Sequence, residues 1–256
     1  MKIISKTFIY ILLFVLTYFI YINPLLTLNT VGILNSTKNI HEFDVVVSHY
    51  KEDLSWLDNY LPENCRLFIY SKSNEKPNCK KKYIHKILKN VGRCDHTYLS
   101  HIILNYDKKL NQNTLFLPGS CDIWYKKLTL NLLIHNIGKY KFNSPTLTSS
   151  KFWIGAMDLL LSYSIRNGYC SAHKNNRHKN CKLNKYKFDN FDEWVKYFNL
   201  KINKICFWGL MLIRTEIIYN RPKEYYINLR NHLNYADSTI NGHFMERSWY
   251  SVFMEK

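Results

Sequence analysis

Residues 90–98 (NVGRCDHTY) combine a glycine, an arginine and an acidic side chain at a spacing that suits anion binding. Gly92 lets the backbone turn tightly, and the Arg93 guanidinium presents a planar fork of N–H donors that matches a phosphate. A helix beginning here would add free N–H groups, and Asp95 stands where its N-cap is expected. The alternative interpretation is an ordinary junction between a loop and a capped helix. The candidate substrate-binding residues of this segment are Asn90, Gly92, Arg93, Asp95 and Tyr98.

A second constellation lies near the C-terminus, in the segment GHFMERSW at 242–249. His243, Glu246 and Arg247 are spaced i, i+3 and i+4, so one face of a helix would carry all three. A carboxylate or an imidazole in this position could act as a general base. Glu246 beside Arg247 could instead form a structural ion pair. We take His243 and Glu246 as candidate catalytic residues and Arg247 as a candidate binding residue.

Two more polar segments follow short apolar runs. The run at 43–48 predicts a buried first strand, because it is rich in β-branched side chains. The run at 114–117 predicts a fourth strand, and Asp122 shortly after it is a candidate catalytic residue. The candidate binding residues that follow the first strand are His49, Tyr50 and Glu52.

Strands and helices are predicted to alternate through the rest of the chain. The clearest helix is at 95–110, where apolar residues recur at i, i+3, i+4, i+7 and i+11 from Leu99. This alternation predicts an α/β fold with a mainly parallel sheet flanked by helices. Because ligands bind beyond the carboxyl ends of parallel strands, the polar segments should converge at one edge of the sheet. The predicted strands are 43–48, 66–70, 83–88, 114–117 and 205–213; the predicted helices are 51–60, 95–110, 124–137, 155–166, 190–199, 222–234 and 243–253.

The N-terminal region indicates a membrane anchor. Residues 7–28 carry no charge and are long enough to cross about 30 Å of hydrocarbon as a helix. Lys2 and Lys6 precede them, which places the tail at 1–6 in the cytosol by the positive-inside rule. We therefore expect an uncleaved signal anchor of a single-pass type II protein, a stem at 29–42 and a domain at 43–256. That domain would be lumenal or extracellular, as in the endoplasmic reticulum, the Golgi or a host membrane. A cleaved signal peptide and a buried core helix are the alternatives.

The composition limits the classes of partner. The hydrophobic fraction of 46% excludes a disordered chain, and 36 Lys and Arg against 19 Asp and Glu give a net charge of +17. Such a charge suits an anionic partner. With the domain on the lumenal or external side, we expect no nucleic acid and favour a phosphate-bearing substrate or an anionic glycan. A lysine-rich solvated surface with no specific partner is the simpler interpretation.

Two cysteines and two histidines form a symmetric pattern, Cys170-x2-His173-x4-His178-x2-Cys181. The spacing suits a zinc site, but the lysines and the arginine between these residues would repel a cation. In an oxidising compartment a disulfide between Cys170 and Cys181 is the favoured interpretation. Free cysteines and bound zinc remain the alternatives.

Five segments together resemble the domain-of-unknown-function 3431 family over most of 43–253. They are SHYKEDLSWL at 48–57, IYSK at 69–72, NVGRCDHTYLSHIILNYDKKL at 90–110, TLFLPG at 114–119 and GHFMERSW at 242–249. The chain is more distantly similar to GT-A-type glycosyltransferase-like proteins, which carry an Asn-x-Gly-Arg-Asp block and a late Glu-Arg motif. This sequence has Cys94 in place of that Asp, and it contains no Asp-x-Asp pair.

The resemblance implies a GT-A-like nucleotide-sugar-binding fold and a membrane-anchored glycosyltransferase. Its partners would be a nucleotide-sugar donor and a glycan or protein acceptor. Arg93 would contact the donor diphosphate, and Glu246 or Asp122, with His243 nearby, would supply the base. Such enzymes commonly use Mn²⁺ or Mg²⁺, for which Asp122 is the nearest single ligand here. The alternative is a non-catalytic, membrane-anchored binding or structural protein that keeps the fold.

Overall fold

The computed structural model describes residues 43–108, 110–148, 188, 190–237 and 239–255. All of them belong to one compact unit, which begins at His41. No helix in these described ranges is both long and apolar enough to cross a membrane. The expected anchor at 7–28, the stem, the predicted helix at 155–166 and the cysteine pair at 170 and 181 lie outside them.

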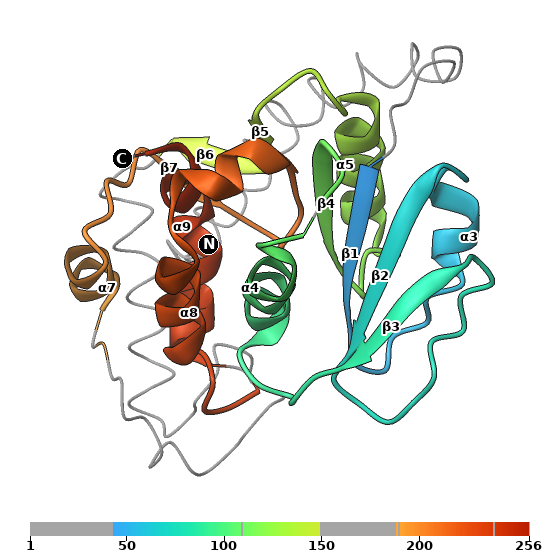
Figure 1. The fold of residues 1–256 in the computed structure, drawn as a ribbon, viewed down its shortest axis with the longest axis horizontal. Coiled ribbons are helices and arrows are strands. Elements are labelled where there is room, and N and C mark those ends of the chain that lie inside the picture. Colours follow the sequence, from blue (N-terminus) through green and yellow to red (C-terminus); the bar gives the residue numbers. More distant parts are fainter. Residues whose placement is uncertain (1–42, 109, 149–187, 189, 238, 256) are drawn as a thin grey trace, which may run out of the picture. The chain divides into compact units, whose positions relative to one another are not determined.

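A six-stranded sheet forms the centre of the domain, in the order β3-β2-β1-β4-β8-β5 (Figure 1). The first four strands in this order are parallel, β8 is antiparallel to β4, and β5 is antiparallel to β8. The prediction of a mainly parallel sheet is therefore confirmed. The strands are β1 (Phe43–His49), β2 (Cys65–Ser71), β3 (Tyr83–Ile87), β4 (Asn113–Pro118), β5 (Phe142–Asn143) and β8 (Met211–Arg214).

Helices lie on both faces of this sheet. Figure 1 shows α4 between the sheet and the helices α8 and α9, whereas α3 and α5 lie on the opposite face. A second, two-stranded antiparallel sheet of β6 (Thr146–Thr148) and β7 (Lys204–Cys206) packs with α9. The helices are α3 (Trp56–Tyr60), α4 (Arg93–Asn105), α5 (Trp124–His135), α7 (Phe191–Tyr197), the 3-10 helix η5 (Thr215–Asn220), α8 (Lys223–Asn231) and α9 (Ile240–Met254).

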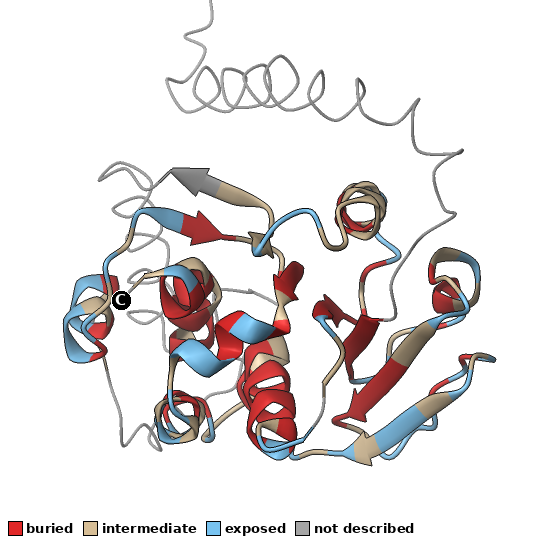
Figure 2. Cartoon of the chain, turned by 45° about the horizontal axis from the view of Figure 1, so that its top comes forward, coloured by how far each residue is buried: buried red, intermediate tan, exposed pale blue. Residues whose placement is uncertain are grey.

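The core explains why the inner strands are continuous apolar runs. Residues 45–47 of β1 and 115–117 of β4 are fully buried, as expected for parallel strands covered on both faces. Helix α4 is buried along most of its length, because the sheet and two helices enclose it (Figure 2). Large aromatic side chains such as Trp194, Trp249 and Tyr226 fill the space between α4, α7, α8 and α9. The charged, exposed positions are left to the outer helices and turns.

Two predicted elements are shorter than the apolar pattern indicated. The helix predicted at 51–60 begins only at Trp56, because the residues before it form turns held by acidic side chains. The Asp53 carboxylate accepts the backbone N–H of Ser55 at 2.8 Å, for example. The strand predicted at 205–213 is divided between β7 and β8, in different sheets. The chain turns between them at Trp208 and Gly209, both with a φ of 67°.

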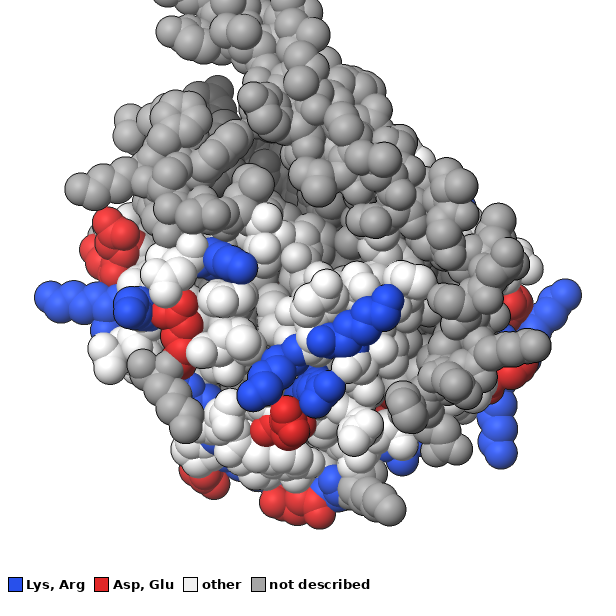
Figure 3. Space-filling model, turned by 90° about the horizontal axis from the view of Figure 1, so that it is seen from above, with Lys and Arg blue, Asp and Glu red and all other residues white. Residues whose placement is uncertain are grey.

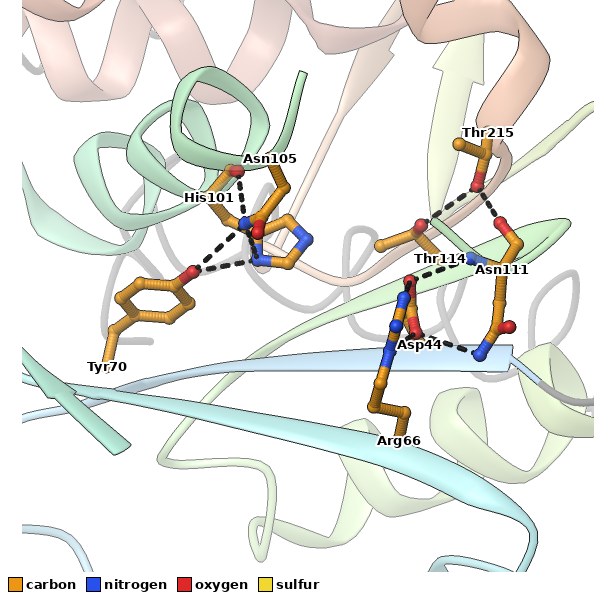
Figure 4. A network of polar contacts seen from close by, with 8 residues as sticks. All are labelled: Asp44, Arg66, Tyr70, His101, Asn105, Asn111, Thr114 and Thr215. Atoms are coloured by element: carbon orange, nitrogen blue, oxygen red, sulfur yellow. Dashed lines mark hydrogen bonds and ion pairs between the residues drawn. The ribbon is translucent and has the colours of Figure 1, made fainter. Parts of the chain in front are cut away.

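An ion pair with a buried carboxylate holds the amino end of β1 (Figure 4). Arg66 donates to both carboxylate oxygens of Asp44, at 2.7 and 2.9 Å, and Asn111 donates through its backbone and side chain at 3.1 and 3.0 Å. Four donors thus compensate the carboxylate for its lost hydration. The ion pair lies at the edge of the sheet opposite the carboxyl ends of the parallel strands. It therefore supports the fold rather than the candidate site.

Candidate functional site

The strand order creates a topological switch point between β1 and β4. The chain moves from β1 outward to β2 and β3, then crosses through α4 to β4 on the other side of β1. In open α/β sheets, ligands bind beyond the carboxyl ends of the strands at such a point. The polar segments after β1 and β4, and the loop before α4, lie at this edge, as the sequence predicted.

The turns after β1 and β4 are tied together. The Glu52 carboxylate accepts the backbone N–H groups of Tyr50 and Lys51, at 2.7 and 3.2 Å. Its Oε2 atom lies 2.7 Å from where a Cβ on Gly119 would be, so only glycine fits there without displacement. Trp56 donates its indole N–H to the Gly119 carbonyl at 3.1 Å. Glu52 therefore braces the turn, and Tyr50 is exposed beside it.

His49 lies beneath the surface rather than in the open crevice. Its Nδ1 atom is 2.9 Å from the Ser71 hydroxyl, which in turn is 2.8 Å from Nε2 of His85. Burial lowers the pKa of His49, which favours the neutral imidazole in this chain of hydrogen bonds. His49 is thus a buried link between β1, β2 and β3.

The loop before α4 is fixed by the segment between α8 and α9. Gly92 and Arg93 both have left-handed backbones, with φ values of 59° and 52°. Their N–H groups donate to the carbonyls of Ala236 and Asp237, at 2.7 and 2.9 Å. A Cβ at position 92 would lie 2.7 Å from Cβ of Leu233, so glycine is required for close approach as well as for φ. These two N–H groups are therefore engaged within the protein, contrary to the expectation that the helix start offers them to an anion.

Lys72 also holds the loop before α4, although it is not among the candidate residues predicted from the sequence. Its Nζ atom donates to the Val91 carbonyl at 2.5 Å and also to the Arg93 carbonyl. Burial lowers the pKa of this ammonium to about 8. No local pattern in the sequence marked Lys72, because its partners are backbone carbonyls of a later loop. Lys72 holds the carbonyls of the loop inward and so helps to fix the direction of Arg93.

Arg93 meets the start of α9 through its side chain. Its Nη1 atom lies 2.7 Å from Nε2 and 2.9 Å from Nδ1 of His243, 150 residues along the chain. The Glu246 carboxylate is 4.0 Å from Nδ1 of the same imidazole. Arg247 is buried and donates Nη1 to the His243 carbonyl at 2.8 Å, so it braces α9 from within. The structure thereby brings Arg93, His243 and Glu246 together from the two sequence constellations.

Asp95 is not the N-cap of α4. The helix begins at Arg93, the N-cap position is Gly92, and no side chain caps it. Asp95 is instead buried and accepts the indole N–H of Trp249 at 2.7 Å. Burial, together with the charge of Glu246, raises the pKa of its carboxyl to about 7. The amphipathic pattern could not distinguish a capping acid from one that joins two buried helices.

The remaining candidates are spread over this edge of the domain. Tyr98 is fully buried and donates to the Gly209 carbonyl at 2.8 Å, whereas Asn90 is exposed in the loop before α4. Asp122 is exposed in the turn between β4 and α5. Among the described residues, no group of three or more His, Cys, Asp or Glu side chains is placed to hold a metal ion.

The described cysteines and surface charges complete the electrostatic environment. Within the described ranges, the cysteines at 65, 79, 94, 121 and 206 are all free thiols. Burial raises the pKa of Cys94 and of Cys121, so neither is a reactive thiolate at neutral pH.

On the described part of the face in Figure 3, basic and acidic side chains stand near one another among uncharged residues. The positive net charge is therefore not gathered into a single block on that face.

These features define an α/β protein with a mostly parallel sheet and a polar, partly buried cluster beside its topological switch point. The chain belongs to the family described as protein of unknown function (DUF3431), whose model matches residues 45–256. The resemblance to the domain-of-unknown-function 3431 family noted in the sequence is thus confirmed. A search of curated proteins finds no match.

Proposed function

We propose that this protein is a glycosyltransferase that transfers a sugar from a nucleotide-sugar donor to a glycan or protein acceptor. The observation that carries the proposal is the contact of Arg93, His243 and Glu246 beside the switch point of a parallel sheet. Sugar transfer requires a cation for the departing diphosphate and a base for the acceptor hydroxyl. This cluster contains a permanent cation and a carboxylate that both lie near one imidazole.

Arg93 would stabilise the diphosphate that leaves the sugar. A guanidinium has five N–H donors, and the hydrogen bonds recorded among the described residues engage only its Nη1. The side chain is half-buried, so a phosphate at this point would be partly shielded from water. Lys72 fixes the backbone of Arg93 from below and so limits the reorganisation needed during the reaction.

Glu246 would accept the proton of the acceptor hydroxyl as the new glycosidic bond forms. It is half-buried on α9, and its carboxylate lies 4.0 Å from Nδ1 of His243, which Arg93 also contacts. The imidazole would keep the carboxylate directed toward the reacting sugar and separate it from the guanidinium. Asp122 is the second candidate for the base, since it is exposed in the turn after β4.

A divalent cation has no assigned step in this mechanism. The charge of the departing diphosphate is assigned to the protein's own cations. Mn²⁺ or Mg²⁺ bound jointly by Asp122 and the substrate's phosphates is a question for the binding experiment below.

The same proposal includes the setting of the enzyme. Residues 7–28 would anchor it as a single-pass type II membrane protein, with residues 1–6 in the cytosol and the domain at 43–256 lumenal or extracellular. A lumenal glycan is then an accessible acceptor, and nucleic acid is not a partner.

One observation favours a second candidate, a non-catalytic binding or structural protein. The N–H groups of Gly92 and Arg93 are bonded within the chain, and Asp95 is enclosed against Trp249. A domain that had lost transfer activity could keep these groups for stability alone.

Binding of nucleotide sugars to the full-length protein tests the proposal. Isothermal titration with UDP-, GDP- and dTDP-sugars, with and without Mn²⁺, should give one donor that binds wild-type protein. Arg93→Ala should weaken it by about 10- to 150-fold, the value of a charged hydrogen bond, and Arg93→Lys should restore part of the affinity. Arg221→Ala removes a half-buried arginine between η5 and α8 and serves as the control. Equal affinities for Arg93→Ala and the control would exclude the assigned role.

A further inference from the structure

We propose that Trp124 at the start of α5 is the stacking platform for a neutral sugar ring of the acceptor. This inference rests on the proposed function and names the class of its acceptor. Trp124 is 61% exposed, which is unusual for the largest apolar side chain in a folded domain. It lies at the carboxyl end of β4, one of the two strands that form the switch point.

The backbone beneath Trp124 is held firmly. Gly119 donates its N–H to the Ser48 carbonyl at 2.7 Å, and the Lys126 ammonium donates to the Ser120 hydroxyl at 2.8 Å. Cys121 is fully buried and fixes the turn between them. The turn is thus anchored at both ends, while Asp122 and Trp124 remain exposed. A preorganised side chain loses little freedom when a ligand binds.

The aromatic groups behind Trp124 fix its orientation. Its ring is perpendicular to that of Tyr125, with centroids 5.7 Å apart, and Tyr125 packs on Trp208 at 4.9 Å. Trp208 is presented by the left-handed turn between β7 and β8. Three aromatic rings from two distant segments therefore meet at this point, and the outermost of them faces solvent.

The chemistry of the platform selects a sugar rather than a nucleotide. The face of an indole ring is electron-rich and apolar, and it suits the C–H groups on one side of a pyranose. The Asp122 carboxylate, two residues earlier, accepts hydrogen bonds and would take the hydroxyl groups at the rim of that ring. The same negative charge repels a phosphate. The donor diphosphate is thereby directed to Arg93 and the neutral acceptor to Trp124.

Saturation-transfer NMR on the full-length protein tests this assignment. The protein should be held in a detergent without a sugar headgroup, and the probes are neutral methyl pyranosides and short neutral oligosaccharides. We expect transfer to the ring C–H protons of at least one probe. Trp124→Ala should weaken that probe about tenfold, equivalent to about 1.4 kcal/mol, and Asp122→Asn should weaken it several-fold. Tyr140→Ala removes an exposed aromatic ring after α5 and should leave the affinity unchanged.

The outcomes separate this inference from the proposed function. No binding of any probe, equal affinities for Trp124→Ala and wild type, or displacement of the probe by uridine would each overturn the platform. If a nucleotide sugar binds wild-type protein and Trp124→Ala equally while no glycan binds, only the platform fails. If a glycan binds through Trp124 and no nucleotide sugar binds at all, the transferase proposal fails and the sugar-binding platform stands.

Discussion

Replacing Gly92 with alanine should destabilise the domain more than the same change at any unconfined left-handed glycine. Gly92 has a φ of 59°, and a Cβ there would lie 2.7 Å from Cβ and 2.8 Å from the carbonyl oxygen of Leu233. The second of these contacts is with backbone, so a side-chain rotation cannot relieve it. The loop would have to move away from the segment that receives the N–H groups of Gly92 and Arg93.

The expected cost has two parts. A left-handed backbone costs an alanine about 1–2 kcal/mol relative to glycine. Crowding in a well-packed interior adds about 1–3 kcal/mol, so the free energy of unfolding should fall by about 2–5 kcal/mol. Gly138→Ala is the matched control, since Gly138 has a φ of 78° and nothing within 4 Å of the added Cβ. Gly138→Ala should therefore lose only about 1–2 kcal/mol, the cost of a left-handed backbone to an alanine.

Urea unfolding of the full-length protein, followed by tryptophan fluorescence, measures both variants. The slope of each transition should remain that of wild type, so that the midpoints report stability. If the two variants lose free energies within about 0.5 kcal/mol of one another, the loop is not packed as described, because surface changes lie within that range.

Three further predictions concern pH, cysteines and topology. Burial lowers the pKa of His96 and of His101 to about 3, and the pKa of Asp95 is raised to about 7. As pH falls below 6.5, the two histidines bind protons only in the unfolded chain, while the Asp95 carboxyl holds its proton in the folded one and opposes them. Stability should therefore fall by roughly 1 kcal/mol per pH unit between pH 6 and 4.5, and Asp95→Asn should steepen the fall; a flat urea-unfolding profile would contradict this. Non-reducing peptide mapping should find Cys170 and Cys181 bridged, with zinc absent from the purified protein; stoichiometric zinc with both thiols free would overturn this. A C-terminal tag should be protected from protease in sealed microsomes, and a digested tag would refute the proposed orientation.

The sequence predicted the sheet because each inner strand contains a continuous apolar run. Phe43–His49 and Asn113–Pro118 are buried on both faces, so a short run of β-branched and aromatic residues was a sufficient signal. The helix predicted at 51–60 was too long, since apolar spacing does not reveal that Glu52 and Asp53 use their carboxylates to close turns. Local patterns recognise burial, but they do not show which partner a polar side chain finds.

The candidate site was predictable only in part, because local patterns and topology place residues but do not identify their distant partners. The topology brought Arg93 and His243 to one edge of the sheet, and the spacing on α9 placed Glu246 beside them. The long-range partners were not visible, because the acceptor for Trp249 is an acid 154 residues earlier and the acceptors for Lys72 are carbonyls of a later loop.

Release of nucleoside diphosphate from the bound donor tests the central claim most directly. Full-length wild-type protein should release the diphosphate from its preferred nucleotide sugar, and a glycan acceptor should accelerate the release. Glu246→Gln preserves the size of the side chain but removes the base, so it should lower the rate by about 10²- to 10⁴-fold while donor binding is kept. If the wild-type protein binds the donor and releases no diphosphate with any acceptor, or if Glu246→Gln releases it at the wild-type rate, the transferase mechanism is contradicted.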